Sequence, residues 1–437
     1  MMEKKQNPWH WVPTLYFAEG IPYFLVNVIS VIMFKNLGMN NADVALYTGI
    51  LYLPWVIKPL WSPFVDIIRT KRWWVLLTQI VVAVSFVLIA LVIPRNPMGK
   101  VGPFVPALVV FWVTAFASAT HDIAADGFYM LALNRRDQSF FVGIRSTFYR
   151  LSSVFGQGII VVVAGLLEKH LGNVPLAWTL TLTGCSVLFG AIALWHTFFL
   201  PRPSSDKGSS NLTVKGIVRD FLRTFFTFFR KRGVVIAMLF MLFYRLPEAF
   251  LVKMLNPFLL DPVTEGGLGL DTEMVGIVYG TVGVLALTLG GILGGMAIAR
   301  WGLKKLMWPM SLSLALTCLV FVYLSFVQPA SLVVVNFCVA LDQFGYGFGF
   351  TAYMLYMMRF SEGEYKTAHY SLCTAFMALS MMLPGMVAGY LQTALGYRGF
   401  FLMVIACCLA TFAVTLAAMR TGFVRDESDS GTGSPNA

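Results

Sequence analysis

The chain contains twelve apolar stretches of 22 to 29 residues each. A helix needs about 20 mostly apolar residues to cross the hydrocarbon core of a bilayer, so every stretch is long enough for one crossing. Hydrophobic residues make up 58% of the chain and charged residues 12%, against about 45–50% and about 25% in soluble proteins. The sequence therefore predicts an all-α polytopic membrane protein. The predicted transmembrane helices are residues 11–35, 44–66, 73–94, 105–133, 140–167, 175–199, 233–260, 273–298, 305–328, 330–358, 367–393 and 398–420.

Basic residues between these stretches predict the orientation of the chain, because Lys and Arg in short loops resist translocation. With the N-terminus inside, the inner segments carry 22 Lys and Arg residues and the outer segments carry four. We therefore expect both termini to be cytoplasmic. The same asymmetry explains most of the net charge of +11, so nucleic-acid binding is not expected. The first stretch is too long for a signal-peptide core and lacks a small-residue cleavage site, so we expect it to be retained.

The positions of the cysteines and histidines argue against disulfide bonds and metal sites. All six cysteines fall within the predicted helices, unlike the loop cysteines that pair in oxidising compartments, so no structural disulfide is expected. The five histidines lack the spacing of metal ligands, so no metal site is predicted. The sequence has no ATP-binding motif. We therefore expect no cofactor and an ion gradient as the driving force.

The chain repeats itself. LGMNNADVALYTG (37–49) returns in altered form as LGLDTEMVGIVYG (268–280), and VAGLLEKHLG (163–172) returns as VAGYLQTALG (387–396). Similarity at a nearly constant offset predicts two parallel six-helix repeats, with the substrate site between them near the bilayer midplane, which is the major facilitator architecture. The predicted organisation is an N-terminal half (1–199), a basic cytoplasmic linker (200–232), a C-terminal half (233–420) and a polar tail (421–437).

Ionisable residues inside the membrane are costly and usually face a partner, a cavity or a pathway. Away from the span ends they occur in spans 1, 2, 4, 5, 7 and 10, whereas spans 3, 6, 9 and 12 have none. This pattern predicts that spans 1, 4, 7 and 10 line a cavity and that every third helix faces lipid. The residues concerned are Glu19, Lys58, Asp122, Asp126, Arg145, Arg150, Arg245, Glu248, Lys253 and Asp342.

Asp122 and Asp126 lie one helical turn apart and share a helix face. Spans 4 and 5 form a hairpin. When one residue of each span lies at the same depth, their two residue numbers add up to about the same value for every such pair. Depth alone therefore pairs Asp126 with Arg145 and Asp122 with Arg150. Two interpretations stay open: a static ion-pair ladder, or a carboxylate that takes up a proton during transport. The neighbouring His121 is either a hydrogen-bonded interior residue or a relay.

Two proline residues and a glycine-rich run are weaker features near these charges. Pro22 and Pro247 lie inside spans 1 and 7 beside a charge, which predicts packing kinks or a bent gate. The run DQFGYGFGF (342–350) alternates glycines with aromatics, which favours close helix packing, with Tyr346 or Phe348 as a stacking surface for substrate as the alternative.

The loop after span 2 holds two residues that a gating loop would use, Asp66 and Arg69, and Arg300 recurs between spans 8 and 9. Anchoring on the cytoplasmic side explains the basic residues but not Asp66.

Several motifs resemble a known family. ASATHDIAADGF (117–128) and FYR (148–150) resemble the SxSQDIxxDAY and GYR signatures of AmpG-type muropeptide permeases, and KPLWSPFVD (58–66) resembles the KFLWAPLxD of that family. In the second half, FYRLPEAF (243–250) and YKTAHYSL (365–372) resemble YKLGDAF and YSATQYAL. By this resemblance Asp122, Asp126, Arg150 and Asp66 occupy family positions, and Glu248 takes the place of the span 7 acid.

The sequence also departs from the family. GFYML (127–131) stands where the family commonly has AYRxE, His121 replaces a glutamine, Phe148 replaces a glycine, and two extra helices of some members are absent. The matching motifs nevertheless imply proton-driven import by this scaffold. The family group that they identify also includes siderophore permeases and acetyl-CoA transporters.

We expect a secondary active transporter of a bacterial inner membrane, working as a monomer and importing a polar organic solute such as an anhydromuropeptide or amino-sugar derivative by alternating access. The expected partners are a small-molecule substrate and the lipid bilayer. The candidates for proton coupling are Asp122, Asp126, Glu19, Glu248 and Asp342. The candidates for substrate binding are Arg145, Arg150, Arg245, Lys58, Tyr23, Tyr149, Tyr346 and Phe348.

Three alternatives remain. A siderophore or other carboxylated-metabolite permease uses the same architecture. A membrane-embedded acyltransferase could use His121 and Asp122 as a base, but no polar cluster supplies a nucleophile, so we expect a non-enzyme. A sensor would usually carry a soluble domain, and the longest loop here has about 33 residues.

Overall fold

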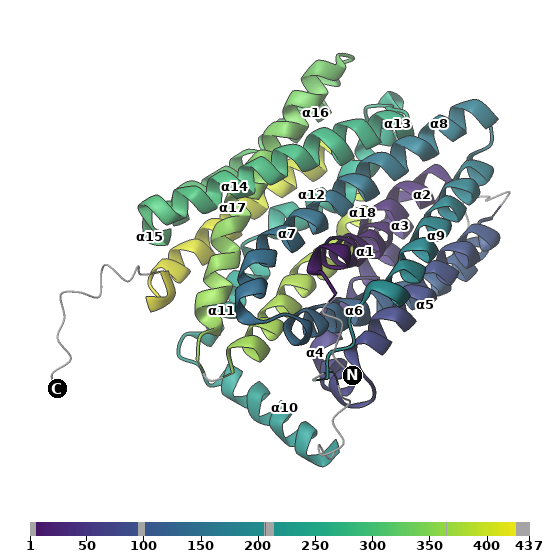
Figure 1. Cartoon of the computed structure of the whole chain (residues 1–437). Helices are drawn as coiled ribbons and strands as arrows, with labels where there is room; N and C mark the ends of the chain where they lie inside the picture. The colour runs from purple at the N-terminus through teal and green to yellow at the C-terminus, as the bar shows by residue number, and fades with distance from the viewer. Residues whose placement is uncertain (1–5, 95–100, 205, 207–213, 364, 425–437) are drawn as a thin grey trace. The chain divides into compact units, whose positions relative to one another are not determined.

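A computed structural model of the chain describes residues 6–94, 101–204, 206, 214–363 and 365–424, and every regular element among them is a helix (Figure 1). Eleven helical stretches are long and apolar enough to cross a membrane. They follow the predicted spans, with one exception at the end of the chain. The stretches are Pro8–Asn36, Asn41–Val65, Lys71–Val92, Gly102–Ala132, Gly143–Leu171, Val174–Phe199, Val234–Leu260, Thr272–Trp301, Leu303–Val327, Leu332–Ser361 and Ala368–Met419.

The exception is α18 (Lys366–Met419), which combines the last two predicted spans. A straight helix of this length would measure about 80 Å, whereas a bilayer core is about 30 Å thick. Gly396 interrupts α18 with a φ of 65° and a ψ of 172°, a conformation that glycine adopts without the penalty of a side chain. The residues on either side of Gly396 therefore form two separate helical segments.

The described chain divides into two compact units. The first unit contains the residues up to 219 together with 270–281, and the second contains 220–269 together with the residues from 282 onward. The segment 270–281 belongs to the C-terminal half by sequence repeat, yet it packs with the first unit. The boundary between the units also falls inside the predicted linker.

In the first unit, α6 lies at the centre of the helix packing. Helices α1, α4 and α5 pack against α6, while α7 packs on α1 and α9 packs on α5. The apolar core includes Trp11 and Phe128, whose rings meet edge to face at 5.2 Å between centroids. The helices are α1 (Val12–Phe24), α2 (Ser30–Asn36), α3 (Asn41–Ile50), α4 (Leu53–Ile67), α5 (Lys71–Val92), α6 (Val105–Ala132), α7 (Arg135–Val154), α8 (Val161–Leu171), α9 (Val174–Phe199) and α13 (Thr272–Val275).

Wide π-helical turns interrupt the first unit's helices at Leu25–Ile29, shortly after Pro22, and at Phe155–Ile160. Gly280, in the π-helical segment Gly276–Gly283, fits against the second of these turns. A Cβ on Gly280 would lie 1.8 Å from the carbonyl oxygen of Gln157.

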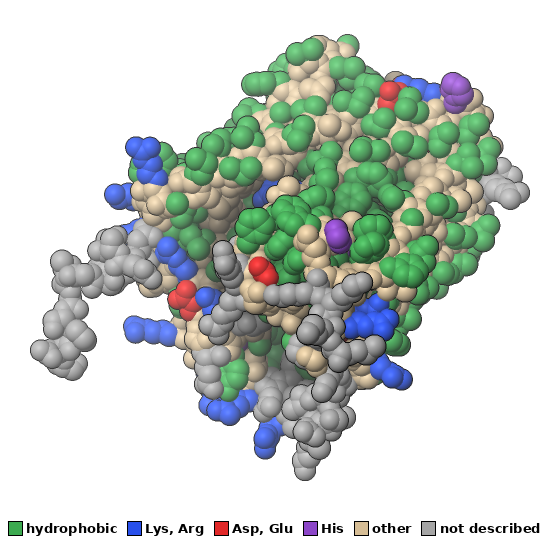
Figure 2. Space-filling model, viewed as in Figure 1, with side chains coloured by type: hydrophobic (Ala, Val, Ile, Leu, Met, Phe, Trp, Pro, Cys, Tyr) green, Lys and Arg blue, Asp and Glu red, His purple; other side chains and the backbone are tan. Residues whose placement is uncertain are grey.

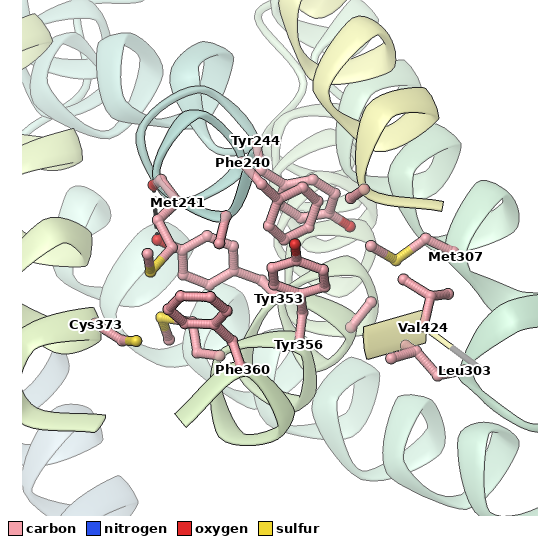
Figure 3. Packing of buried hydrophobic residues seen from close by; sticks show 14 of the residues in the cluster. Phe240, Met241, Tyr244, Leu303, Met307, Tyr353, Tyr356, Phe360, Cys373 and Val424 are labelled. Atoms are coloured by element: carbon pink, nitrogen blue, oxygen red, sulfur yellow. Dashed lines mark hydrogen bonds between the residues drawn. The ribbon is translucent and has the colours of Figure 1, made fainter. Parts of the chain in front are cut away.

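The second unit is built around α17 and α18. Helix α14 runs along α17, and α11 and α12 pack on α18 (Figure 1). Between them lies an aromatic core in which the Phe240 and Tyr356 ring centroids are 4.4 Å apart (Figure 3). The helices are α11 (Val234–Phe243), α12 (Leu246–Leu260), α14 (Val284–Trp301), α15 (Leu303–Leu316), α16 (Leu319–Val327), α17 (Leu332–Ser361) and α18; α10 (Val214–Phe229) precedes them.

The glycine run of span 10 provides close helix contacts, which confirms the packing interpretation. A Cβ on Gly347 would lie 2.1 Å from the Leu287 carbonyl oxygen of α14, and one on Gly345 would lie 2.4 Å from the Thr317 side chain. Alternate residues of α17 therefore let its backbone approach the helices on both sides.

Large apolar side chains cover much of the surface of each unit, as Figure 2 shows for one face. Leu91 and Val187 of the first unit are 73% and 68% exposed, and Val333 and Leu409 of the second are 78% and 71% exposed. Such a surface is expected where lipid, rather than water, surrounds the protein.

Candidate functional site

Five ionisable side chains from four helices meet in the first unit. They are Glu19 of α1, Lys58 of α4, Asp122 and Asp126 of α6, and Arg145 of α7, and we refer to them as the α6 charge cluster. The two aspartates face the same side of α6 because they are one turn apart, and α1 and α4 both pack on that helix.

Asp122 forms an ion pair with Lys58, whose ammonium group donates a hydrogen bond to Oδ2. The two side chains are 22% and 21% exposed. Lys58 reaches Asp122 from α4, 64 residues earlier in the chain. A charge in such a poorly hydrated position requires an opposite charge close by, and this pairing supplies it.

Asp126 forms a second ion pair with Arg145, with 2.9 Å between Oδ1 and Nη2. The hydroxyl of Tyr16 donates to the same oxygen at 3.1 Å. The Arg145 guanidinium lies over the rings of Tyr16 and Tyr129, 4.6 Å and 5.2 Å from their centroids. The pair is thus held by charge, hydrogen bonding and cation–π attraction together.

One rung of the predicted ladder is confirmed and the other is wrong. Asp126 does pair with Arg145, but Asp122 pairs with Lys58, and the Arg150 side chain is exposed. Residues 122 and 126 differ by about 40° around their helix, whereas residues 145 and 150 differ by about 140° around theirs. Two arginines so far apart in rotation cannot both face the two aspartates.

Glu19 adds an unbalanced carboxyl group to the cluster. Its side chain is 8% exposed, and its Oε2 atom has no hydrogen-bond partner among the described residues. The Glu19 carboxyl lies within hydrogen-bonding range of the Asp122 carboxyl. The cluster therefore contains three acids and two bases, and two neighbouring carboxyls can share a hydrogen bond only when one of them carries a proton.

Beside this cluster, His121 belongs to a buried chain of hydrogen bonds across four helices. Its Nε2 atom lies 3.0 Å from the amide nitrogen of Gln79, and the amide oxygen of Gln79 lies 3.0 Å from His196 Nδ1. His196 Nε2 in turn lies 2.9 Å from the Thr14 hydroxyl. His121 is thus a hydrogen-bonded interior residue, although its Nδ1 atom has no partner in the described part of the chain.

Tyr23 and Tyr149, predicted to bind substrate, join an aromatic group in the first unit. The Tyr23 ring lies 5.2 Å from the rings of both Phe24 and Trp55, and Tyr149 lies 5.8 Å from Phe24. Each tyrosine ring is therefore held in place by neighbouring aromatic rings.

In the second unit, the structure brings Arg245 and Tyr346 together. Arg245 is buried and donates a hydrogen bond to the Tyr346 hydroxyl, and its guanidinium lies 4.7 Å from the Phe350 ring centroid and 5.7 Å from that of Tyr353. Phe348 lies elsewhere and stacks on Phe344. A guanidinium close to aromatic rings has the planar, forked geometry that suits a carboxylate or phosphate.

The remaining predicted residues fall into two groups. Glu248 and Asp342 come together with Cys318 in the interior of the second unit. Of the gating candidates, Arg69 and Arg300 are exposed and lie over the rings of nearby tryptophans, Trp73 and Trp301, at 6.0 Å and 5.3 Å. The side chain of Asp66 is outside the described residues.

Comparison with known proteins supplies the family. The sequence matches the Major Facilitator Superfamily over residues 14–369, well over half of the chain. This chain belongs to the major facilitator superfamily. It is therefore a membrane transporter.

Curated relatives of this facilitator confirm the resemblance to AmpG. It is 24% identical to the anhydromuropeptide permease of Escherichia coli K12, with 93% of this chain and 79% of the relative aligned. It is 23% identical to the putative transporter AmpG 4 of Rickettsia conorii, over 92% and 94% of the two chains. An uncharacterised protein of Haemophilus influenzae is 25% identical over 88% of each chain.

Solved structures support the facilitator fold. The nucleoside transporter NupG has a TM-score of 0.68 at 14% identity, covering 94% of this chain and 98% of that one. A bacterial homologue of the human lysosomal transporter Spinster has a TM-score of 0.70 at 15% identity, covering 95% and 97% of the two chains.

Some polar groups of this facilitator escaped the sequence reasoning. Gln79 and His196 lie in spans 3 and 6, which were assigned to lipid because only charges were counted. Counting neutral polar residues would have found them. Lys58 was identified as a membrane charge, but hairpin depth compares only neighbouring spans and could not assign it to Asp122.

Proposed function

We propose that this facilitator imports a polar organic solute together with protons into a bacterial cytoplasm. An anhydromuropeptide or an amino-sugar derivative is the proposed class of solute. In this proposal the chain crosses the inner membrane twelve times, counting α18 as two crossings, with both termini in the cytoplasm. It works as a monomer, and its halves expose the solute site alternately to the two sides of the membrane.

The imbalance of the α6 charge cluster carries the proton coupling. Asp122 and Asp126 each form an ion pair, whereas Glu19 lies beside the Asp122 carboxyl and forms no ion pair among the described residues. A proton on this carboxyl pair gives the cluster zero net charge. Loss of that proton leaves an uncompensated negative charge at membrane depth, which favours a change of partners among Glu19, Asp122 and Lys58.

Two observations support the class of solute. The relatives aligned along nearly the whole chain include an anhydromuropeptide permease. The stacked guanidinium of Arg245 is suited to a carboxylate, which muropeptides and other carboxylated metabolites carry.

Uptake by purified protein in proteoliposomes tests the proposal. The assay compares anhydromuropeptide, amino sugars and a ferric siderophore, each with and without an inward proton gradient. We expect concentrative uptake of an anhydromuropeptide or amino sugar that disappears when the gradient is collapsed. Glu19→Gln should remove the dependence on the gradient, whereas Glu265→Gln, at an exposed acid outside the cluster, should not. Concentrative uptake that survives collapse of the gradient would refute proton coupling.

A further inference from the structure

Three side chains in the second unit direct ligand-type atoms at one point. Glu248 comes from α12, Asp342 from α17, and Cys318 from the junction between α15 and α16. One carboxylate oxygen from each acid and the sulfur of Cys318 all lie within 4.8 Å of one another. The three side chains are at most 1% exposed.

The acids in this group lack the partners that burial demands. Neither carboxylate oxygen of Glu248 has a hydrogen-bond partner among the described residues, and the same holds for Oδ1 of Asp342. The other Asp342 oxygen accepts from the adjacent Gln343, at 3.1 Å. Buried carboxylate oxygens without donors are strongly disfavoured, so these three oxygens require compensation by a bound cation or by protons.

The group lies next to an irregular turn of one membrane helix. Span 7 breaks at Tyr244 and Arg245, which places Glu248 in the first turn of α12. Cys318 lies in span 9 at a turn between α15 and α16, where Thr317 and Cys318 keep right-handed helical dihedrals. An irregular turn in a membrane helix is found in transporters where it lines a binding site, and it changes the direction of the side chains that follow it.

The donor set favours a particular class of ion. Sodium, magnesium and calcium prefer oxygen ligands alone, whereas two carboxylates with one thiolate suit zinc and related divalent ions. Three protein ligands with an open fourth position are a known arrangement for zinc. Three deprotonated ligands carry three negative charges, which a divalent cation and the nearby Arg245 together balance.

The first unit offers a contrast. Its equivalent interior helices, in spans 1, 3, 4 and 6, hold the neutral chain of Thr14, Gln79, His121 and His196, in which neighbours satisfy one another by hydrogen bonds. In the second unit, spans 7, 9 and 10 supply two acids and a thiol that do not hydrogen-bond one another. The first unit also holds two close acids, Glu19 and Asp122, and one Glu19 oxygen has no hydrogen-bond partner among the described residues, but there Lys58 supplies a positive charge to Asp122.

We propose that Glu248, Asp342 and Cys318 form a buried binding site for one divalent cation of the zinc class. The site lies within the second unit, and it does not depend on the proposed transport function. Cation binding would hold spans 7 and 9 to α17, so the bound ion stabilises this unit.

Cadmium binding to the purified full-length chain in detergent tests the proposal, after treatment with a chelator. We expect one Cd²⁺ per chain, with the ultraviolet absorption of a cadmium–thiolate bond, and displacement by Zn²⁺. Cys318→Ser should abolish the absorption, and Asp342→Asn should weaken binding by at least about ten-fold. Cys185→Ser, at a buried thiol in α9 of the first unit, is the matched control and should leave both signals unchanged.

Thermal unfolding provides a second, independent readout. Zn²⁺ should raise the unfolding temperature of the chelator-treated wild-type chain, and the rise should vanish in Glu248→Gln. Cadmium absorption that persists in Cys318→Ser would refute the site. A second outcome would also refute the site: Cd²⁺ does not bind, and the wild-type chain shows an infrared band of a protonated carboxyl that is lost in Asp342→Asn. In that case a proton compensates the charge of the acids.

Discussion

The Asp126 carboxylate and the Arg145 guanidinium are joined at 2.9 Å between α6 and α7, while Arg150, five residues further along α7, is exposed. The same helix thus carries one arginine in a specific site and one outside it. Because Arg145 also lies over two tyrosine rings, its contribution includes more than the ion pair.

Alanine substitutions should separate these two arginines. Arg145→Ala removes the ion pair and the stacking, and we expect it to lower the free energy of unfolding by about 1–2 kcal/mol. Arg150→Ala should change it by less than about 0.5 kcal/mol, because the side chain is exposed. Unfolding in detergent, followed by circular dichroism, measures both. Equal losses for the two variants would contradict the assigned pairing.

Asp122 and Lys58 should show strong coupling in stability. Asp122→Asn leaves the Lys58 charge without its partner, which should cost about 3 kcal/mol because the site is poorly hydrated. Combining it with Lys58→Met removes both charges and should recover most of the loss. A double variant as unstable as the sum of both single variants would show that the two side chains do not interact.

A transport assay should distinguish a proton-coupling role of Asp122 from a purely structural one. If it takes part in proton coupling, Asp122→Asn abolishes gradient-driven uptake but spares exchange between internal and external solute, because exchange needs no net proton movement. Exchange and uptake are measured in the same proteoliposomes. Loss of both activities together with loss of folding would assign the residue a structural role.

Gly280 should not tolerate a side chain. Gly280→Ala places a methyl group 1.8 Å from the Gln157 carbonyl oxygen, so the two π-helical segments must separate, and we expect a loss of about 3 kcal/mol. Gly184→Ala is the control, since no atom lies within 4 Å of its Cβ position. Thermal unfolding of both variants tests whether segment 270–281 is packed on the first unit as described.

Arg245→Lys should distinguish a stacked guanidinium from a simple positive charge. Lysine retains the charge but loses the planar fork and the stacking on Phe350, so the KM for a carboxylated solute should rise at least about ten-fold. Uptake kinetics in proteoliposomes provide the measurement. An unchanged KM in a folded variant would remove Arg245 from the solute site.

The sequence was sufficient for the features that depend on length and local composition. Apolar length predicted the membrane helices, and alternating glycines predicted the close approach of α17 to its neighbours, because only glycine permits it. Hairpin depth also predicted the pairing of Asp126 with Arg145, since a short turn fixes which residues lie at equal height.

Tertiary structure decided the partners that depend on rotation and on distant helices. Depth places Arg150 level with Asp122, but only the rotation of α7 excludes it and only the packing of α4 supplies Lys58. The meeting of Glu248, Asp342 and Cys318 likewise depends on how three helices distant in sequence pack together. Sequence thus determined which segments enter the membrane, because burial of apolar surface is a local property. Which charges meet there depends on the angles at which helices pack, and these arise only when the whole unit is folded.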